Sequence, residues 1–445
     1  MAVTAALAAP ACGPDVDPAR EGPPSVILVS LDTLRYDHCG FNGYERDTTP
    51  FLDRFAQECI VFDRAYTTMS WTLIAHMSMV TGLYPTQHGV VEAELALSPE
   101  VPTLAQRLAA EGYTNLGVHY PGWLDRRFGF GRGFGTYESA PNAEEAGREL
   151  EVGLEAVRPG WPFFMFVHLF DIHSGVLMGP SSSMYNPPPP FDELFMPGAR
   201  AALGGVDMKA WWDRPAAPTA LQKQAITALY DGGIRYVDSK LEAWFTEWES
   251  RGLLDDTIVI ITSDHGEGLR QRQARFGGHG DLHEEGLRIP LLVRLPRGER
   301  GGERLDSLVS LVDIVPTVLE LAGLDRDERL PGRSLVGPAR PVDEWVFASR
   351  ADVGAAVRRD RKIIYEGLDA RRMYDLEQDP LELHPFTESE SRATFLAEAP
   401  ALLDSALVQL SGYVSPPDPR DVGELDEATQ DNLRALGYGG EVGGD

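Results

Sequence analysis

An aspartate and a histidine, Asp264 and His265, stand side by side in the sequence, separated by two residues from the preceding apolar run 258–261 and directly before Gly266. A carboxylate oxygen and an imidazole nitrogen can hold a metal ion or exchange protons with a substrate. The β-branched run is typical of a strand buried on both faces, and open α/β sheets bind ligands beyond the carboxyl ends of such strands. A single Asp-His pair is more often a helix cap beside a surface histidine, so other strands must end in the same way before a site is indicated.

A second carboxylate also follows a predicted strand. The apolar segment 25–31 has the composition of a first strand, and Asp32 follows it directly. Two such strands would bring Asp32 and Asp264 to one edge of the sheet, where their like charges would repel each other and invite a cation. We therefore expect a cation site at this edge. The nearby Arg35 and Asp37 are expected to form a structural ion pair or cap instead.

A hydroxyl and an imidazole lie close together on one predicted helix. Residues 75–80 suit a helix that Gly82 ends, with Thr72 at or just before its N-terminus. Thr72 is then either the cap of the helix or a nucleophile at its positive end, where free N–H groups favour a phosphate or sulfate. His76 lies one turn further along, so both side chains can face the same ligand.

Length and composition restrict the protein class. A chain of 445 residues, 43% hydrophobic and 24% charged, can bury the core of one large α/β domain with a smaller appendage, or of two or three domains. The net charge of −28 argues against nucleic acid as a partner, because a polyanion would be repelled. A small anionic substrate would need local positive charge from a bound cation, an arginine or protonated histidines. The sequence leaves the oligomeric state open.

The N-terminal segment 1–24 has features of an export signal and a linker. Residues 2–11 are small and apolar, and Ala-Pro-Ala-Cys-Gly at 9–13 resembles a loose bacterial lipoprotein processing site. A basic start and a longer apolar core are missing, so a plain disordered tail is the alternative. The prediction is an extracytoplasmic protein of the periplasm or cell envelope, with a lipid anchor at Cys12. The chain has three cysteines, whose spacing indicates neither a disulfide framework nor a zinc pattern.

These stretches belong to a longer series of seven motifs, which occur in the order SLDTLRYDHCG, SWTLIAHMSMVTGLYPTQHGV, TIVIITSDHGEG, GHGDLHEEGLRIPLLVRLP, SLVSLVDIVPTVLELAGL, MYDLEQDPLE and LRALGY. From about Ser25 to the C-terminus the chain resembles the sulfatase family of the alkaline phosphatase superfamily. The resemblance implies an α/β fold in which helices sandwich a large mixed sheet, followed by a smaller α+β domain built on an antiparallel sheet. The catalytic domain is expected at 25–325 and the C-terminal subdomain, with its acidic tail, at 326–445.

The chain departs from the sulfatase pattern at the position of the nucleophile. Sulfatases convert a Cys or Ser in a Cys/Ser-x-Pro-x-Arg motif into formylglycine, but here Thr72, Ile74 and His76 occupy the Cys, Pro and Arg positions. Threonine is not a substrate for that oxidation. Phosphodiesterases and phosphoglycerol transferases of the superfamily instead use a metal-bound threonine. The resemblance therefore favours hydrolysis of phosphate mono- or diesters or phosphonate esters, with sulfate ester hydrolysis, phosphoglycerol-type transfer or an inactive binding protein as alternatives.

A free threonine hydroxyl is a poor nucleophile, and a divalent cation would lower its pKa. The predicted ligands of one such ion are Asp32, Thr72, Asp264 and His265. Three oxygens and one nitrogen suit Zn, Mn, Mg or Ca. Thr33 stands where many sulfatases have a second aspartate.

Two histidines are further catalytic candidates by resemblance. His173 matches a substrate-contacting histidine of sulfatases, and His279 takes the place of a substrate-binding lysine. Each could donate to an ester oxygen or protonate the leaving group. The other three considered, His88, His119 and His168, are expected to be packed or surface residues.

A second metal site is a rival arrangement. Some superfamily members bind two zinc ions, and Asp171, His173 and His279 could hold the second one. We prefer one ion because this Asp-x-His spacing is shorter than the usual Asp-x-x-x-His. The Pro-, Gly- and Ser-rich segment 174–219 is expected to cover the cleft as a lid or specificity wall, or else to be a surface loop without a role.

Overall fold

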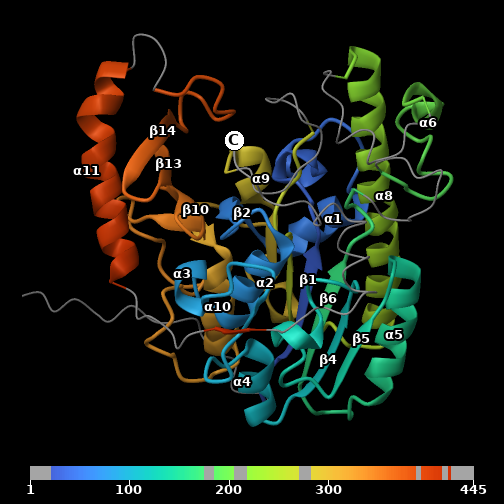
Figure 1. Cartoon of the computed structure of the whole chain (residues 1–445). Coiled ribbons are helices and arrows are strands. Elements are labelled where there is room, and N and C mark those ends of the chain that lie inside the picture. The colour runs from blue at the N-terminus through green and yellow to red at the C-terminus, as the bar shows by residue number, and fades with distance from the viewer. Residues whose placement is uncertain are drawn as a thin grey trace, which may run out of the picture.

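The structure is a computed structural model that describes residues 22–174, 185–204, 218–269, 282–386, 392–412 and 419–421. Its largest feature is a mixed sheet of nine strands (Figure 1). These are β1 (Ser25–Leu31), β2 (Ile60–Tyr66), β4 (Thr114–His119), β5 (Thr136–Ser139), β6 (Phe163–Leu169), β7 (Thr257–Thr262), β8 (Arg288–Ile289), β9 (Leu291–Arg294) and β10 (Arg304–Ser310).

Strand order places β1 in the middle of this sheet. The order is β10-β2-β9-β7-β1-β6-β4-β5, and β8 pairs with β2. Strand β1 is parallel to both of its neighbours, β7 and β6, whereas β9 is antiparallel to β7 and β2. The carboxyl ends of β7, β1 and β6 therefore meet at one edge of the sheet.

Helices cover both faces of the large sheet because its strands are apolar on both sides. In β1, Val26 and Leu28 join one hydrophobic core, and Ile27 and Val29 join the other. The first core contains side chains of α2 (Thr72–Thr81), α4 (Leu104–Ala110) and α10 (Ile314–Leu321). The second contains side chains of α1 (Pro50–Phe55), α5 (Ala143–Glu155) and α8 (Ala220–Ser250), and Figure 1 shows the long α8 beside α5. The doubly buried strands explain the continuous apolar runs.

Shorter helices connect these elements. They are α3 (Pro85–His88), α6 (Ala199–Ala202), α9 (Glu284–Leu287) and the 3-10 helices η1 (Tyr36–His38), η2 (Gly40–Asn42), η3 (Ala56–Glu58), η4 (Arg126–Phe128), η5 (Pro296–Gly298) and η6 (Leu311–Asp313). Within the described ranges, no helix has the length and apolar character needed to cross a membrane.

A smaller antiparallel sheet follows in the chain. Its order is β11 (Val346–Arg350), β12 (Val353–Val357), β13 (Arg361–Glu366) and β14 (Asp369–Asp375). Helix α11 (Arg392–Ser411) packs on it through Ala399, Leu403 and Ala406. A two-residue pair joins β3 (Leu95–Ala96) to β15 (Arg420–Asp421). The predicted fold class, a large mixed sheet between helices with a smaller antiparallel domain, is confirmed, and the predicted boundaries at 24/25 and 325/326 stay predictions.

The small sheet also contacts the segment that leads into α2. The amide of Ser349, in β11, donates to the carbonyl oxygen of Thr68 over 2.9 Å. The guanidinium of Arg350 lies 4.6 Å from the ring centroid of Trp71, the residue that precedes α2. Side chains of the C-terminal sheet therefore border the start of the helix that carries Thr72.

Candidate active site

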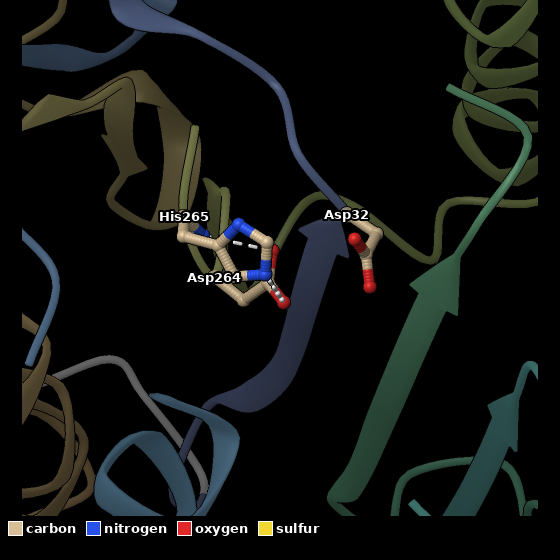
Figure 2. A group of neighbouring side chains, drawn as sticks. All are labelled: Asp32, Asp264 and His265. Atoms are coloured by element: carbon tan, nitrogen blue, oxygen red, sulfur yellow. Dashed lines mark hydrogen bonds and ion pairs between the residues drawn. The ribbon is translucent and has the colours of Figure 1, made fainter. Parts of the chain in front are cut away.

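The two strand-end aspartates lie close together, as the sequence predicts. Asp32 follows β1, and Asp264 with His265 follows its parallel neighbour β7 (Figure 2). One ligand atom from each of the three residues lies within 4.8 Å of the others, and all three residues are fully buried. The amide of Thr33 donates to Oδ1 of Asp264 over 3.2 Å. This bond connects the two strand ends directly.

Thr33 has a backbone conformation that a β-branched residue rarely adopts. Its φ is 58°, in the left-handed region. The hydroxyl of Tyr230, in α8, donates to the carbonyl oxygen of Thr33 over 2.7 Å and accepts from the amide of Arg35 over 2.9 Å. The side chain of Thr33 donates to the carbonyl oxygen of Asp32 over 2.7 Å. Helix α8 thus holds the turn that directs Asp32 into the site.

Thr72 completes the group of four predicted metal ligands. It is the first residue of α2, and Trp71 rather than Thr72 occupies the cap position. Its Oγ1 lies 3.3 Å from Oδ2 of Asp32 and 3.3 Å from Nε2 of His265. Because Thr72 does not cap the helix, its hydroxyl is directed at the acid and the imidazole. The helix ends at Gly82, whose φ of 74° fits the predicted terminating glycine.

The backbone fixes the tautomer of His265. Its Nδ1–H donates to the carbonyl oxygen of Gly266 over 2.8 Å, so the lone pair of the neutral ring is on Nε2. Nε2 is the atom that faces Thr72 and lies 3.4 Å from Oδ2 of Asp264. A histidine that donates with one nitrogen and offers the other has the arrangement of a metal ligand.

Buried oxygens in this group lack partners that a cation would supply. Oδ1 of Asp32 and Oδ2 of Asp264 are buried and accept no hydrogen bond from the described residues. Burial and repulsion from Asp264 raise the pKa of Asp32 well above its usual range. Burial also opposes ionisation of Asp264, but attraction from His265 and other nearby imidazoles outweighs it and lowers the pKa of that carboxyl. The predicted ligand set consists of three oxygens and one nitrogen, and its two carboxylates each have an oxygen that accepts no hydrogen bond from the described residues. This set fits a divalent ion.

His168 also belongs to this site, although its sequence context favours an ordinary packed or surface residue. The amide of Tyr120 donates to Nδ1 of His168 over 3.3 Å, so Nε2 carries the proton and donates to Oδ2 of Asp32 over 2.9 Å. Burial lowers the pKa of His168 to about 4, which keeps the ring neutral. The only sequence signal is a polar residue inside the apolar strand 163–169.

His76 lies behind Thr72, with both ring nitrogens occupied. Its Nδ1–H donates to the carbonyl oxygen of Thr72 over 2.8 Å, and Nε2 accepts from Ser30 over 2.9 Å. Burial lowers the pKa of His76 to about 3. These contacts join the first turn of α2 to β1, so they position Thr72. A direct catalytic step by His76 stays a prediction.

The remaining sequence candidates are His173, His279 and Asp171. His173 is fully buried, stacks on Phe170 with 3.9 Å between ring centroids, and bonds through Nδ1 to the carbonyl oxygen of Ser174. Burial lowers its pKa to about 3. His279 lies outside the described residues. Oδ1 of Asp171 accepts from the first amide of α5, at Ala143, over 3.1 Å. A second metal site from Asp171, His173 and His279 stays the alternative to the predicted single ion.

Three further expectations concern an ion pair, the insertion and the N-terminal cysteine. Arg35 and Asp37 form the expected ion pair at 2.7 Å. The part of the insertion at 185–204 packs against α8, where a Cβ on Gly232 would lie 2.4 Å from the carbonyl oxygen of Phe191. The predicted lid at 174–219 stays a prediction, and Cys12 lies outside the described residues.

Comparison with known proteins identifies the family. Residues 24–324 match the family model described as Sulfatase. An arylsulfatase of Clostridium perfringens (strain 13 / Type A) is 22% identical over 451 aligned positions, which cover 82% of this chain and 91% of that protein. The uncharacterized sulfatase YidJ of Escherichia coli (strain K12) is 30% identical over 141 positions, covering 29% of this chain and only 28% of its own length.

A solved structure gives the same result for the fold. The phosphonate monoester hydrolase of Agrobacterium radiobacter superposes with a TM-score of 0.71 at 21% identity, covering 91% of this chain and 98% of that one. At this identity the likeness shows the fold alone. The family match extends over most of the chain, including the segments that carry Asp32, Thr72, Asp264 and His265. The chain therefore belongs to the sulfatase family of the alkaline phosphatase superfamily, a family of metal-dependent hydrolases.

Proposed function

We propose that this protein is a metal-dependent hydrolase of phosphate mono- or diesters or of phosphonate esters, with Oγ1 of Thr72 as the attacking atom. The observation that supports this most directly is the position of Oγ1, which lies 3.3 Å from both Asp32 Oδ2 and His265 Nε2 at the first turn of α2. A threonine at the formylglycine position favours this chemistry over that of a typical sulfatase. The phosphonate monoester hydrolase among the solved structures of the same fold is consistent with it.

One divalent ion held by Asp32, Thr72, Asp264 and His265 would lower the pKa of the hydroxyl and offset the charge of an anionic ester. Groups of the chain itself can accept the proton and bind the ester. Oδ2 of Asp32 accepts the hydroxyl proton of Thr72, and the N-terminal turn of α2, where backbone amides favour an anion, would bind the ester oxygens. The Oγ1–phosphorus bond forms as the ester P–O bond breaks.

His173 and His279 are the proposed contacts with the ester oxygens and the leaving group. Because Nδ1–H of His173 already donates to the carbonyl oxygen of Ser174, its Nε2 can donate only after the ring takes up a second proton. Water then attacks the phosphorylated Thr72, the Oγ1–phosphorus bond breaks and the free hydroxyl returns. Transfer to an alcohol in place of water would give the phosphoglycerol-type reaction. His76 and His168 keep Thr72 and Asp32 in place during these steps, because their ring nitrogens bond to those two residues.

Sulfate ester hydrolysis is the second candidate, supported by the match to an arylsulfatase over most of both chains. An inactive binding protein is the third, because the Pro and Arg of the sulfatase motif are replaced by Ile74 and His76. For the location we propose the periplasm or cell envelope, with a lipid anchor at Cys12. This rests on the small apolar segment 2–11 and the Ala-Pro-Ala-Cys-Gly sequence.

A substrate panel tests the proposed function. Aryl phosphate monoester, phosphodiester, phosphonate and sulfate substrates are assayed with Mn²⁺ and with Zn²⁺ for the wild type, Thr72→Ser and Thr72→Ala. We expect Thr72→Ala to lose at least about 10³-fold in kcat/KM on the phosphorus esters. Thr72→Ser keeps a hydroxyl and should retain measurable turnover. Acid-quenched wild type should carry a phosphoryl group on the peptide that contains Thr72.

Thr81→Ala is the matched control. Thr81 lies at the other end of the same helix, is 1% exposed like Thr72, and its hydroxyl donates to the carbonyl oxygen of Met77. Its replacement should leave kcat/KM close to that of the wild type. Turnover that survives in Thr72→Ala would remove Thr72 from the proposed mechanism. A wild type that binds a substrate but turns over none of the panel would favour the binding protein.

A further inference from the structure

A buried lysine of the small sheet pairs with two carboxylates. Lys362, in β13, is fully buried, and its Nζ lies 3.0 Å from Oε1 of Glu284 and 2.9 Å from Oε1 of Glu382. Burial acts to lower the pKa of Lys362, but attraction from Glu382 and Glu284 outweighs it and raises the pKa above its ordinary value. The amine is therefore a charged group enclosed by protein.

The lysine and its partners hold the first residue of α9. Glu284 begins that helix, and its amide donates to Oε2 of Glu382 over 2.8 Å. The other oxygen of Glu284, Oε2, accepts from the hydroxyl of Tyr66 in β2 over 3.1 Å. His283, the residue before the helix, contacts the hydroxyl of Tyr374 in β14 through Nε2 at 3.1 Å. The start of α9 is thus fixed between the small sheet and the large one.

The other end of α9 holds the loop that carries His265. The amide of Gly266 donates to the carbonyl oxygen of Gly286 over 2.9 Å. The two segments are so close that a Cβ on Gly266 would lie 1.9 Å from the carbonyl oxygen of Glu285. The carbonyl oxygen of Gly266 in turn accepts Nδ1–H of His265. A continuous series of contacts therefore runs from Lys362 through α9 to the imidazole.

We propose that Lys362 is a positioning residue for the metal centre: through Glu284 and α9 it holds Gly266, and Gly266 sets the tautomer and direction of His265. The inference rests on the proposed metal site and assigns the C-terminal sheet a part in building it. An apolar side chain could fill the same space without an ionic group, so packing alone does not explain a charged lysine there. The lysine holds Glu284 in one direction, which an apolar contact does not.

The test compares Lys362→Met with Arg340→Met in the full-length chain. Arg340 and Asp313 form another ion pair, at 2.8 Å, with both side chains 2% exposed, and neither residue touches α9 in the described contacts. Two quantities are measured for each variant: amide hydrogen exchange of the peptide 263–269 without added metal, and the Kd for Mn²⁺. We expect Lys362→Met to speed exchange in this peptide and to weaken Mn²⁺ binding, each by about 10-fold. Arg340→Met should leave both close to the wild-type values.

A second variant separates positioning from loss of stability. Lys362→Met leaves two carboxylates without their cation, which strongly destabilises a buried pair. The double variant Lys362→Met with Glu382→Gln removes one of these charges, and we expect its stability to recover in part while exchange of 263–269 stays fast and Mn²⁺ binding stays weak. Wild-type exchange and wild-type Mn²⁺ affinity in the double variant, or equal losses in Arg340→Met, would overturn the inference. The exchange readout needs neither substrate nor Thr72 chemistry, so its outcome is independent of the proposed function.

Discussion

Nε2 of His168 donates a hydrogen bond to Oδ2 of Asp32 over 2.9 Å, while Oδ1 of the same carboxylate is buried and accepts no hydrogen bond from the described residues. The neutral ring therefore occupies one oxygen of Asp32 and leaves the other for an ion. Metal-binding carboxylates are commonly oriented by partners of this kind.

Replacing His168 should weaken metal binding without changing the ligands. We expect His168→Phe to raise the Kd for Mn²⁺ by about 10-fold or more, because Oδ2 of Asp32 loses the imidazole N–H that orients it. The control is His119→Phe. His119 is equally buried but stacks on Tyr137 and bonds to the carbonyl oxygen of Tyr120. Titration with a competing chromophoric chelator measures both values, and similar Kd values in the two variants would contradict the assignment.

Removal of the metal should destabilise the wild type and not the variant Asp32→Asn. At an ion concentration of 100 times Kd, binding should add about 2.7 kcal/mol to the free energy of unfolding, and a chelator should remove this gain. Asp32→Asn should lose the gain, yet should be more stable than the chelated wild type, because it lacks one of two buried like charges. Urea unfolding with and without chelator measures both. Elemental analysis that found two ions per chain would contradict the single-ion site.

A methyl group at Gly266 should disturb the same loop through sterics alone. In Gly266→Ala the new carbon would meet the carbonyl oxygen of Glu285 at 1.9 Å, so the backbone must move. We expect a loss of about 1 to 3 kcal/mol in the free energy of unfolding, together with weaker Mn²⁺ binding. Gly135→Ala is the control, because its nearest contact would be an ordinary 3.6 Å. Unchanged Mn²⁺ affinity in Gly266→Ala would show that α9 and the His265 loop are not coupled.

The buried His88 should make stability depend on pH. Its Nε2 contacts Ser78 at 3.1 Å, its Nδ1 accepts from the amide of Val90 at 3.1 Å, and burial lowers its pKa to about 3. Between about pH 6.5 and pH 3, the unfolded chain takes up a proton at this residue that the folded chain does not. His88 therefore contributes stability above about pH 6.5 that is lost as the pH falls, with a slope of up to about 1.4 kcal/mol per pH unit.

The measurement for His88 is the free energy of unfolding in urea at pH 7, 6 and 5. The free energy of unfolding should decline less steeply toward pH 5 in His88→Gln than in the wild type. The slopes should differ by at most about 1.4 kcal/mol per pH unit, the contribution of one proton. His384→Gln, which removes an exposed histidine, should decline like the wild type. Equal slopes for all three proteins would show that His88 is not the source of the dependence.

Much of the site could be predicted because its signals are local. Asp32, Asp264 and His265 each follow a strand that is apolar on both faces. Parallel neighbouring strands place such residues at the same edge of the sheet. Gly82 and the spacing before it located α2, which places Thr72 in the first turn. These inferences needed only residues within a few positions of one another, together with the order of the motifs along the chain.

What could not be predicted depends on which strands are neighbours and on side-chain rotamers. His168 reaches Asp32 because β6 pairs with β1 in a register that sets Ser30 opposite His168, and no local pattern gives that register. The spacing of His76 placed it on the face of Thr72, but the ring turns back to the carbonyl oxygen of Thr72 and to Ser30. The pairing of Lys362 with Glu284 joins segments 78 residues apart. Such contacts are properties of the assembled fold.

The bond between Thr33 and Asp264 spans 231 residues of the chain. During synthesis, the first strand and its acid are therefore made long before their partner loop exists. The proposed ligand set for the ion can be complete only after β7 has paired with β1, so binding of the proposed ion would be a late step of folding. In a compartment poor in that ion, the chain would finish folding with two acids facing each other across an unfilled centre.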